Sequence, residues 1–328
     1  NWNGGVVPAE NESVVFDGRG SSTVVIDGEI LVENLTFATN TDTTEVPEPV
    51  TEYTLEAGEG DSLLLVNSNL AVNNGSTVNV ATEVAITNHT RIAKGATLTV
   101  NEGGALRSQN GIENNGTINN NYDVIIGSGV SVGSATADTL TNNGTFNNNA
   151  EGVLTVGEDI INSGTLNNAG ELSAAGLVEN SGSIAVTDGT VTIGVTGTAD
   201  DVTSLDNDSS IAVSGGVVTI NGSVDNDGTI TIGGIVLDDS SKTVTVDGEE
   251  AGLTPIEYDI LKLLMEHPGK VYSTRVIYET VWQENPYGSE NAVAVHIRHL
   301  REKIEINPSE PRYIKVVWGR GYKMEAIK

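Results

Sequence analysis

Short segments in which apolar and polar residues alternate fill the first 234 residues of the chain. Segments 154–156, 191–193, 218–220 and 230–232 each place a threonine between two apolar residues. Alternation with a period of two, in stretches rich in Val, Ile and Thr, predicts β-strands. No segment with helical periodicity interrupts the series, so we expect this part of the chain to consist of short strands joined by corners.

These strands belong to an internal repeat. Each repeat reads Asn, then Asn, Ser or Asp, then Gly or Ser, then Thr or Ser, then an apolar residue, and the repeats begin at Asn114, Asn142, Asn162, Asn180, Asn207 and Asn226. Spacings of 18 to 28 residues are typical of solenoids, and the Asn-Gly and Asp-Gly pairs are expected to supply positive φ at the corners. The pattern predicts a parallel β-helix in which the recurring asparagines stack into hydrogen-bonded ladders. An up-and-down barrel or stacked hairpins are the alternative folds.

The first 70 residues repeat less regularly. We expect strands at 14–16 and 24–28, and an exposed loop at 40–49, where polar residues and prolines gather. An open solenoid end leaves a strand edge unpaired. The segment that contains Trp2 is therefore expected to cap the N-terminal coil.

From residue 235 onward the pattern changes. Short strands around an Asp-Gly turn are expected in segments 235–238 and 243–248. Thr254, Pro255 and Glu257 then occupy the N-cap, N1 and N3 positions of a capping box, which predicts the start of a helix. This helix is expected to end at His267-Pro268-Gly269, and a second helix to run from Ser273 to Trp282.

A third helix is expected from about 290 to 305, because its apolar residues recur at helical spacing. They are Val293, Ile297, Leu300 and Ile304. Residues 313–324 then form a hairpin. The predicted fold is therefore mostly β: an N-terminal parallel β-helix at 1–234, followed by a C-terminal α+β winged helix-turn-helix at 235–328.

Charge supports this division. Residues 1–234 hold 4 Lys and Arg against 30 Asp and Glu, whereas residues 235–328 hold 12 against 15. The slight excess of acidic over basic residues in 235–328 is unfavourable for binding phosphate. If this part binds DNA, its basic residues must therefore gather on one face. The chain has no Cys, which excludes disulfides and thiol catalysis. It also has no apolar run long enough to span a membrane.

The repeat region lacks the groups that an enzyme would need. A uronate lyase needs Lys or Arg as base or charge partner, and this region has only four such residues in all. A hydrolase needs two carboxylates at a fixed separation. Its acidic clusters, Asp200-Asp201 and Asp206-Asn207-Asp208, lie in turn-like stretches where Asp is common. Oxygen ligands suit Ca²⁺, but the glycine-rich nonapeptide pattern is missing. We expect no catalytic residue, no metal and no cofactor, and the region resembles adhesin-like repeats of bacterial surface proteins.

The C-terminal part carries a series of motifs that run through it in order. They are Leu253-Thr254-x-x-Glu257, His267-Pro268-Gly269-Lys270-Val271, Val281-Trp282, Val295-His296-Ile297-Arg298-His299-Leu300-Arg301-Glu302-Lys303-Ile304, Asn307-Pro308 and Tyr313-Ile314-Lys315-Val316-Val317-Trp318-Gly319-Arg320-Gly321-Tyr322. In order and spacing they resemble the OmpR/PhoB-type DNA-binding domain of response regulators, above all its VanR-like branch in Gram-positive bacteria. The resemblance implies major-groove reading by the third helix and a minor-groove or phosphate contact by the wing hairpin.

The residue types on the third helix agree with DNA reading. Arg can bind guanine with two hydrogen bonds, Asn can bind adenine, and Val can contact a thymine methyl. The predicted contacts on this helix are Asn291, Val295, Arg298 and His299. Further contacts are expected from Arg320 at the wing tip, Lys315 and Lys323 on the wing strands, and Arg275 on the second helix.

Some positions depart from the family pattern or are expected to be structural. Asn291 and His299 stand where Arg is frequent in the family, which puts the base preference in doubt. Arg301 is expected to be a structural ion-pair partner. Trp318 and Tyr322 are expected to pack in the core.

Two functions follow from these expectations. In the first, the winged helix binds double-stranded DNA as a cytoplasmic transcription regulator without a receiver domain, and the β-helix is a scaffold or a sensor of protein or glycan ligands. In the second, the protein is an exported cell-surface adhesin whose winged helix is an interaction module. The chain begins with Asn1 and not with Met. We therefore expect that an N-terminal segment was removed; a signal peptide there would place the protein outside the cell.

Overall fold

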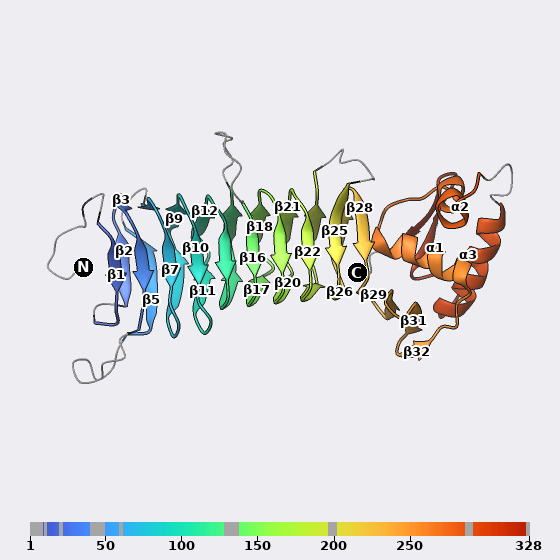
Figure 1. The fold of residues 1–328 in the computed structure, drawn as a ribbon, viewed down its shortest axis with the longest axis horizontal. Coiled ribbons are helices and arrows are strands. Elements are labelled where there is room, and N and C mark those ends of the chain that lie inside the picture. Colours follow the sequence, from blue (N-terminus) through green and yellow to red (C-terminus); the bar gives the residue numbers. More distant parts are fainter. Residues whose placement is uncertain are drawn as a thin grey trace. The chain divides into compact units, whose positions relative to one another are not determined.

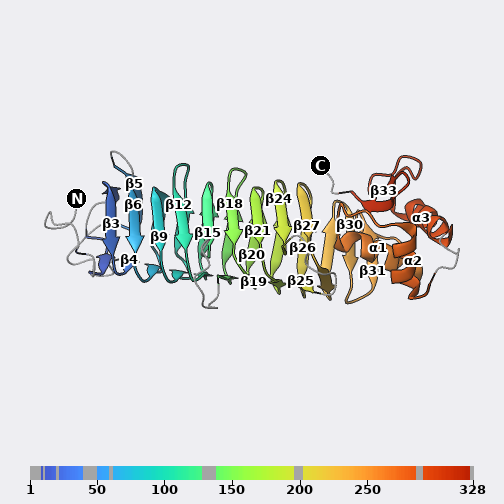
Figure 2. The same ribbon diagram turned by 90° about the horizontal axis from the view of Figure 1, so that it is seen from above.

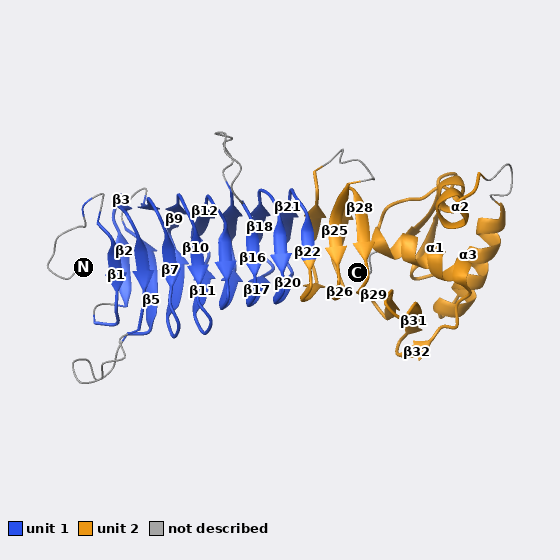
Figure 3. Cartoon of the chain, in the orientation of Figure 1, with its two compact units in different colours: residues 1–179 blue, residues 180–328 orange. Residues whose placement is uncertain are grey.

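The structure is a computed structural model that describes residues 9, 12–19, 22–39, 50–58, 62–127, 138–195, 202–285 and 291–325. The chain divides into two compact units, residues 1–179 and 180–328 (Figure 3). The expected loop at 40–49 and the expected cap around Trp2 lie outside the described residues.

Unit 1 is a parallel β-helix with three strands in each coil (Figure 1). Its first face consists of β1 (Val14–Phe16), β4 (Leu35–Phe37), β7 (Leu70–Val72), β10 (Thr90–Ile92), β13 (Ile112–Asn114), β16 (Leu140–Asn142) and β19 (Ile160–Asn162). The second consists of β2 (Thr23–Ile26), β5 (Glu52–Ala57), β8 (Thr77–Ala81), β11 (Thr97–Val100), β14 (Thr117–Asn120), β17 (Thr145–Asn148) and β20 (Thr165–Asn168). The third consists of β3 (Glu29–Val32), β6 (Leu63–Val66), β9 (Glu83–Ile86), β12 (Ala105–Ser108), β15 (Asp123–Ile126), β18 (Val153–Val156) and β21 (Glu171–Ala174).

The core of unit 1 consists of columns of apolar side chains that stack from coil to coil. Parallel pairing places Val78, Leu98, Ile118, Phe146 and Leu166 in register, and all five are buried. Because strand side chains alternate between faces, the residues between these columns point outward. The period-two pattern of the sequence is therefore the inside–outside pattern of the coils.

Buried asparagines form the predicted ladders. In the inner asparagine ladder (Asn114, Asn142, Asn162), the Nδ2 of each of the first two residues donates to the Oδ1 of the next at 2.7 Å. All three side chains are fully buried. A buried amide is stable only when its donors and acceptor are satisfied, and stacking at the coil spacing meets that requirement.

The glycines of the repeat allow a close approach between backbones. A Cβ on Gly144 would lie 2.1 Å from the carbonyl oxygen of Gly116, and one on Gly164 would lie 2.1 Å from that of Gly144. None of these three residues has a positive φ. The predicted positive φ is confirmed at other pairs, such as Asp27-Gly28 (φ +81°), Asn110-Gly111 (φ +103°) and Asp188-Gly189 (φ +72°), but not at these three corners. Glycine is needed here because successive corners stack backbone on backbone.

Unit 2 begins with further β-helix strands. These are β23 (Ser183–Val186), β24 (Thr190–Ile193), β25 (Thr203–Asn207), β26 (Ser210–Val213), β27 (Val217–Ile220), β28 (Ser223–Asn226) and β29 (Thr229–Ile232); β22 (Val178–Asn180) lies at the boundary of the units. The asparagine ladder recurs here, since Asn180 donates to Asn207 and Asn207 to Asn226, both at 2.7 Å.

The rest of unit 2 has the element order of a winged helix (Figure 2). It contains β30 (Ile235–Asp238), β31 (Thr243–Val246), β32 (Glu249–Glu250), α1 (Pro255–Glu266), α2 (Thr274–Trp282), α3 (Asn291–Ile304), β33 (Ile314–Val317) and β34 (Gly321–Met324). The capping box of α1 is confirmed: the Thr254 amide donates to the Glu257 carboxylate at 2.8 Å, and the Glu257 amide donates to the Thr254 hydroxyl. The three helices are the only ones among the described residues.

One strand belongs to both parts of unit 2. On one side β29 pairs in parallel with β26 of the coil, and on the other side it pairs antiparallel with β30. The predicted domain boundary at 234/235 falls in the two-residue link between β29 and β30. The winged helix therefore continues a sheet of the β-helix and is not joined to it by a separate linker.

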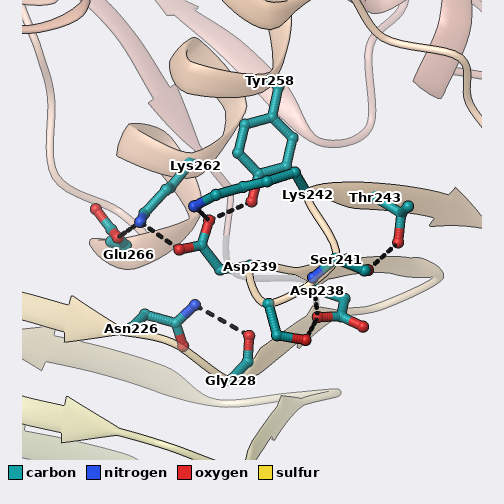
Figure 4. Close-up of polar contacts among 11 residues, drawn as sticks. Asn226, Gly228, Asp238, Asp239, Ser241, Lys242, Thr243, Tyr258, Lys262 and Glu266 are labelled. Carbon is teal, nitrogen blue, oxygen red and sulfur yellow. Dashed lines mark hydrogen bonds and ion pairs between the residues drawn. The ribbon is translucent and has the colours of Figure 1, made fainter.

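A buried polar cluster holds α1 against this sheet (Figure 4). Asp239, which follows β30, accepts hydrogen bonds from the Tyr258 hydroxyl, from Lys262 Nζ at 2.8 Å and from Lys242 Nζ at 2.7 Å. Burial would raise the pKa of Asp239, but these hydrogen bonds outweigh burial and hold the pKa below its ordinary value. Asp239 is therefore a buried carboxylate whose charge is compensated.

The C-terminal end of α1 covers the coil core of unit 2. Met265 and Glu266 line a small cavity of about 40 Å³ together with apolar coil residues such as Ile184 and Ile230. His267, beyond the helix, is buried, and its Nε2–H donates to the Gly222 carbonyl at 3.0 Å. Burial raises the pKa of Glu266 to about 7, although Lys262 lies nearby and lowers it.

Candidate nucleic-acid interface

The predicted base-reading residues lie together on one face of α3. Asn291, Val295, Arg298 and His299 are all exposed, and Val295 is 52% exposed. The opposite face packs against the other helices through buried Val293, Ile297, Leu300 and Ile304. At about 100° per residue, spacings of three, four and seven residues return to the same side of a helix. The apolar stripe therefore fixes which side chains α3 presents to solvent.

Arg298 forms an ion pair with a residue of its own helix. Its Nε lies 3.1 Å from the Glu302 carboxylate, one helical turn away, and Arg298 is 78% exposed. Exposed pairs at this spacing stabilise a helix by only about 0.3–0.5 kcal/mol. The guanidinium can therefore leave Glu302 at little cost when it meets guanine or phosphate, and its planar set of donors suits either group.

A group of aromatic rings supports α3 from α2. Trp282 stacks on Tyr278 with ring centroids 4.6 Å apart, and its edge meets His296 at 5.4 Å. His299 lies 6.5 Å from His296 on the exposed side. The rings fix the approach of α2 to α3. The prediction did not assign this role to His296, because contact with Trp282 depends on how the helices pack.

The wing is the hairpin of β33 and β34, and it carries three predicted phosphate contacts. Lys315 and Lys323 face each other in the register of the two strands. Lys315 donates to the Pro311 carbonyl, and Lys323 lies 3.0 Å from Glu325. Arg320 is exposed in the connecting turn, and no ion pair to it is found in the described part of the chain.

Trp318 departs from the prediction that it packs in the core. It is 93% exposed at the tip of the wing. Tyr322, predicted to be buried with it, is half-buried, and the Arg301 guanidinium lies 5.9 Å from its ring centroid. The prediction failed for Trp318 because no described element covers the end of the hairpin.

Two side chains that join α3 to the wing hold the interface in shape. Arg301 donates to the Ile314 carbonyl at 2.7 Å, so it is structural, but its partner is a backbone carbonyl and not a carboxylate. Glu305, buried just after α3, accepts from the backbone amides of Arg312, Tyr313 and Ile314. Sequence analysis missed Glu305, because its acceptor role depends on where residues 312–314 fold.

Ion pairs offset much of the positive charge of the winged helix. Arg275 on α2 lies 2.8 Å from Glu279, and Lys303 lies 2.6 Å from the buried Glu257. Among the described residues there is no cluster of acidic or histidine side chains that could hold a metal ion. No described helix is long and apolar enough to cross a membrane.

Comparison with known proteins agrees with this geometry. Residues 248–324 match the family described as "Transcriptional regulatory protein, C terminal". The regulatory protein VanR of Enterococcus faecium is 38% identical over 101 residues, which cover 30% of this chain and 44% of VanR. The uncharacterized transcriptional regulatory protein YcbL of Bacillus subtilis is 42% identical over 95 residues, which cover 29% of this chain and 42% of YcbL. The chain thus spans less than half the length of these relatives.

Matches to solved structures likewise cover less than a third of this chain. The DNA-binding domain of Klebsiella pneumoniae RstA, solved in complex with the RstA box, is 28% identical, with a TM-score of 0.29. The match covers 30% of this chain and 97% of that domain. The response regulator DrrB of Thermotoga maritima is 35% identical, with a TM-score of 0.27, and the match covers 28% of this chain and 42% of DrrB.

Proposed function

We propose that this protein regulates transcription by binding double-stranded DNA, since its C-terminal part is a winged-helix DNA-binding domain of the OmpR/PhoB type. In this proposal α3 reads bases in the major groove, and the wing and α2 contact the backbone or the minor groove. The reading takes place in the cytoplasm, where DNA is available.

The exposed face of α3 is the observation that carries the proposal. Within unit 2, the coil strands are joined to the winged helix through β30, the end of α1, His267 and Tyr313, whose hydroxyl accepts from the Gly234 amide at 3.1 Å. None of these contacts uses the exposed residues of α3 or the wing tip. The β-helix strands of unit 2 therefore leave the proposed reading surface open.

The exposed side chains suggest distinct roles. Arg298 would bind guanine, Asn291 adenine, and Val295 a thymine methyl group, while His299 borders the same face. The remaining contacts would position the domain on the duplex through phosphates. They are Arg320, Lys315 and Lys323 on the wing, and Arg275 on α2.

The β-helix would act as a non-catalytic scaffold or as a sensor of a protein or glycan. Unit 1 offers a groove of about 500 Å³ for such a ligand, lined by His89, Arg91 and Glu113 among others. Arg91 and Glu113, both among its lining residues, form an ion pair at 2.8 Å. Because unit 1 is strongly acidic, an uncharged polar ligand suits this groove better than an anionic one.

A second function is favoured by one observation. Arg275, Arg298 and Lys323, all proposed DNA contacts, are each paired with a carboxylate. Such pairing reduces the net positive charge that this face offers to phosphate, and a face of mixed charge also suits contact with another protein, as in an exported, adhesin-like protein whose winged helix is an interaction module. The same experiment distinguishes the two functions.

The test is to select duplexes from a random library with the full chain and then to titrate the enriched duplex at 50 and 200 mM salt. Substitution R298A should weaken binding about 5- to 150-fold, the loss expected for one bidentate base contact. The matched control is R91A, because Arg91 is also exposed, at 68%, and paired with a glutamate. Failure to enrich any sequence, together with no binding at 50 mM salt, would rule out DNA binding and favour the second function.

A further inference from the structure

Strand β27 in unit 2 has a partner strand on one side only. It is the last strand of the third face of the coils, and among the described strands it pairs with β24 and with no other (Figure 2). The second face, by contrast, continues beyond its last coil strand into β30. An edge strand presents backbone N–H and C=O groups that have no partner within the sheet. A further strand can therefore add to β27.

The bonds between β27 and β24 show which backbone groups face the open side. The amides of Val217 and Asn221 donate to carbonyls of the β24 coil, at 2.9 and 2.8 Å. Successive residues of a strand in a parallel sheet direct their backbone groups to opposite sides. The N–H and C=O groups of Val218 and Ile220 therefore point away from β24, towards the position that a next strand would occupy.

A groove of about 420 Å³ lies along this open side. It is lined by residues 217–222 of the coil and by residues 267–270, which follow α1. His267 already takes one backbone group of the edge, since its Nε2–H donates to the Gly222 carbonyl at 3.0 Å. Lys270 is exposed, and it is the only Asp, Glu, Lys or Arg among the described residues that line the groove. An acidic side chain on the occupant would complement this charge.

The coil core next to the groove is not completely filled. Val218, Ile220 and Pro268 line the groove and also the apolar cavity of about 40 Å³ at the end of α1. Every second side chain of an added strand would point inward, towards this cavity. An apolar side chain there would restore contacts that the cavity lining lacks. Main-chain hydrogen-bonding groups together with apolar side chains at alternate positions are the features of an extended peptide.

We propose that β27 captures an extended segment of a partner protein, which adds as a parallel strand with apolar residues at alternate positions and an acidic residue near Lys270. In strand addition of this kind, main-chain hydrogen bonds supply affinity and side-chain pockets supply specificity. The parallel direction continues the stacking of the coils. The inference does not rest on DNA binding, because none of these residues belongs to the proposed reading surface.

The probe is a peptide copied from β24, because that strand already pairs with β27 in parallel. It has the sequence of residues 188–194, Asp-Gly-Thr-Val-Thr-Ile-Gly, followed by one added Asp. Calorimetric titration into the full chain measures its affinity. At saturation, hydrogen exchange of the Val218 and Ile220 amides should slow at least about 10-fold. Exchange of the Val217 and Asn221 amides, which are already bonded to β24, should not change.

Modified peptides test the direction and the pattern of the added strand. In the register that β24 and β27 share, the two threonine amides of the peptide would donate to β27, whereas the valine and isoleucine amides would point away. N-methylation of either threonine should therefore weaken binding at least about 5-fold, and N-methylation of the valine or the isoleucine less than about 2-fold. A peptide in which each apolar residue is exchanged with the threonine before it keeps the composition but turns the apolar side chains outward. It should bind about 10-fold more weakly.

A charge-reversal variant tests the role of Lys270. K270E should weaken binding of the acidic probe about 2- to 5-fold at 50 mM salt, and less at 200 mM. A probe with Lys in place of both Asp residues should bind K270E more tightly than the wild type. The matched control is K94E, because Lys94 is also exposed but does not line the groove; it should bind the acidic probe as the wild type does.

Three results would overturn the proposal. The first is that the probe fails to protect the Val218 and Ile220 amides. The second is a loss of affinity on N-methylation of the valine and isoleucine in place of the threonines, because the added strand would then be antiparallel. The third is self-association of the chain in sedimentation that the probe reverses, because a second copy would then occupy the edge. None of these results depends on DNA, so the proposed function stands or falls separately.

Discussion

Asn142 lies in the middle of the inner asparagine ladder and allows a sharp test of what holds the coils together. Its amide donates to Asn162 Oδ1 at 2.7 Å and to the Thr165 carbonyl at 2.9 Å, and its Oδ1 accepts from Asn114 at 2.7 Å. Substitution N142A removes all three hydrogen bonds inside a core that water does not reach.

The expected cost follows from the groups that lose a partner. Each buried polar group that loses a hydrogen bond costs about 1–3 kcal/mol, and N142A affects three such groups. Asn114 keeps a second bond, to the Thr145 carbonyl at 2.9 Å, which places the total towards the low end. We expect the free energy of unfolding of these coils to fall by about 3–5 kcal/mol.

The matched control is N147A, in the same coil. Asn147 belongs to an outer asparagine ladder (Asn119, Asn147, Asn167), with bonds to both neighbours at 2.8 Å. It is half-buried, so water can replace its partners, and the loss should be about 1 kcal/mol or less.

Native-state hydrogen exchange over residues 140–168 would measure both losses, because solenoid stability is largely local. Urea unfolding would report the global change. If N142A and N147A lose the same free energy, the reasoning from buried hydrogen bonds is wrong.

Two further predictions concern unit 2. Burial raises the pKa of Glu266 from 4.5 to about 7, so its protonated form stabilises the fold fully below about pH 4.5, and this contribution of about 3 kcal/mol is lost as pH rises to about 7. E266Q should therefore unfold at a higher temperature than the wild type at about pH 8 and at an equal temperature near pH 4; parallel pH profiles would contradict this. Glu305 accepts from three backbone amides, so E305A should destabilise the winged helix by about 2–4 kcal/mol, measured by thermal unfolding. E302A, which removes an exposed carboxylate from the same region, should change stability by less than about 0.5 kcal/mol, and an equal effect would count against the role of Glu305.

Local pattern in the chain was sufficient for most of the fold. Alternation with a period of two predicted the strands, and the recurring asparagines predicted ladders such as Asn114–Asn142–Asn162. The capping box at Thr254 and the apolar stripe of α3 were also predicted correctly. The capping box and the apolar stripe depend on neighbours within one or a few helical turns, and the ladders depend on a motif that each repeat carries at the same position, so the spacing of residues along the chain is enough to predict them.

The features that were missed depend on contacts between distant segments. The sharing of β29 between coil and winged helix, the docking of His267 on Gly222 and the acceptor role of Glu305 each join residues that only folding brings together. Trp318 is exposed for the same reason. An aromatic residue in a hairpin is buried only if another element covers it, and whether one does is decided by tertiary packing and not by the spacing of residues along the chain.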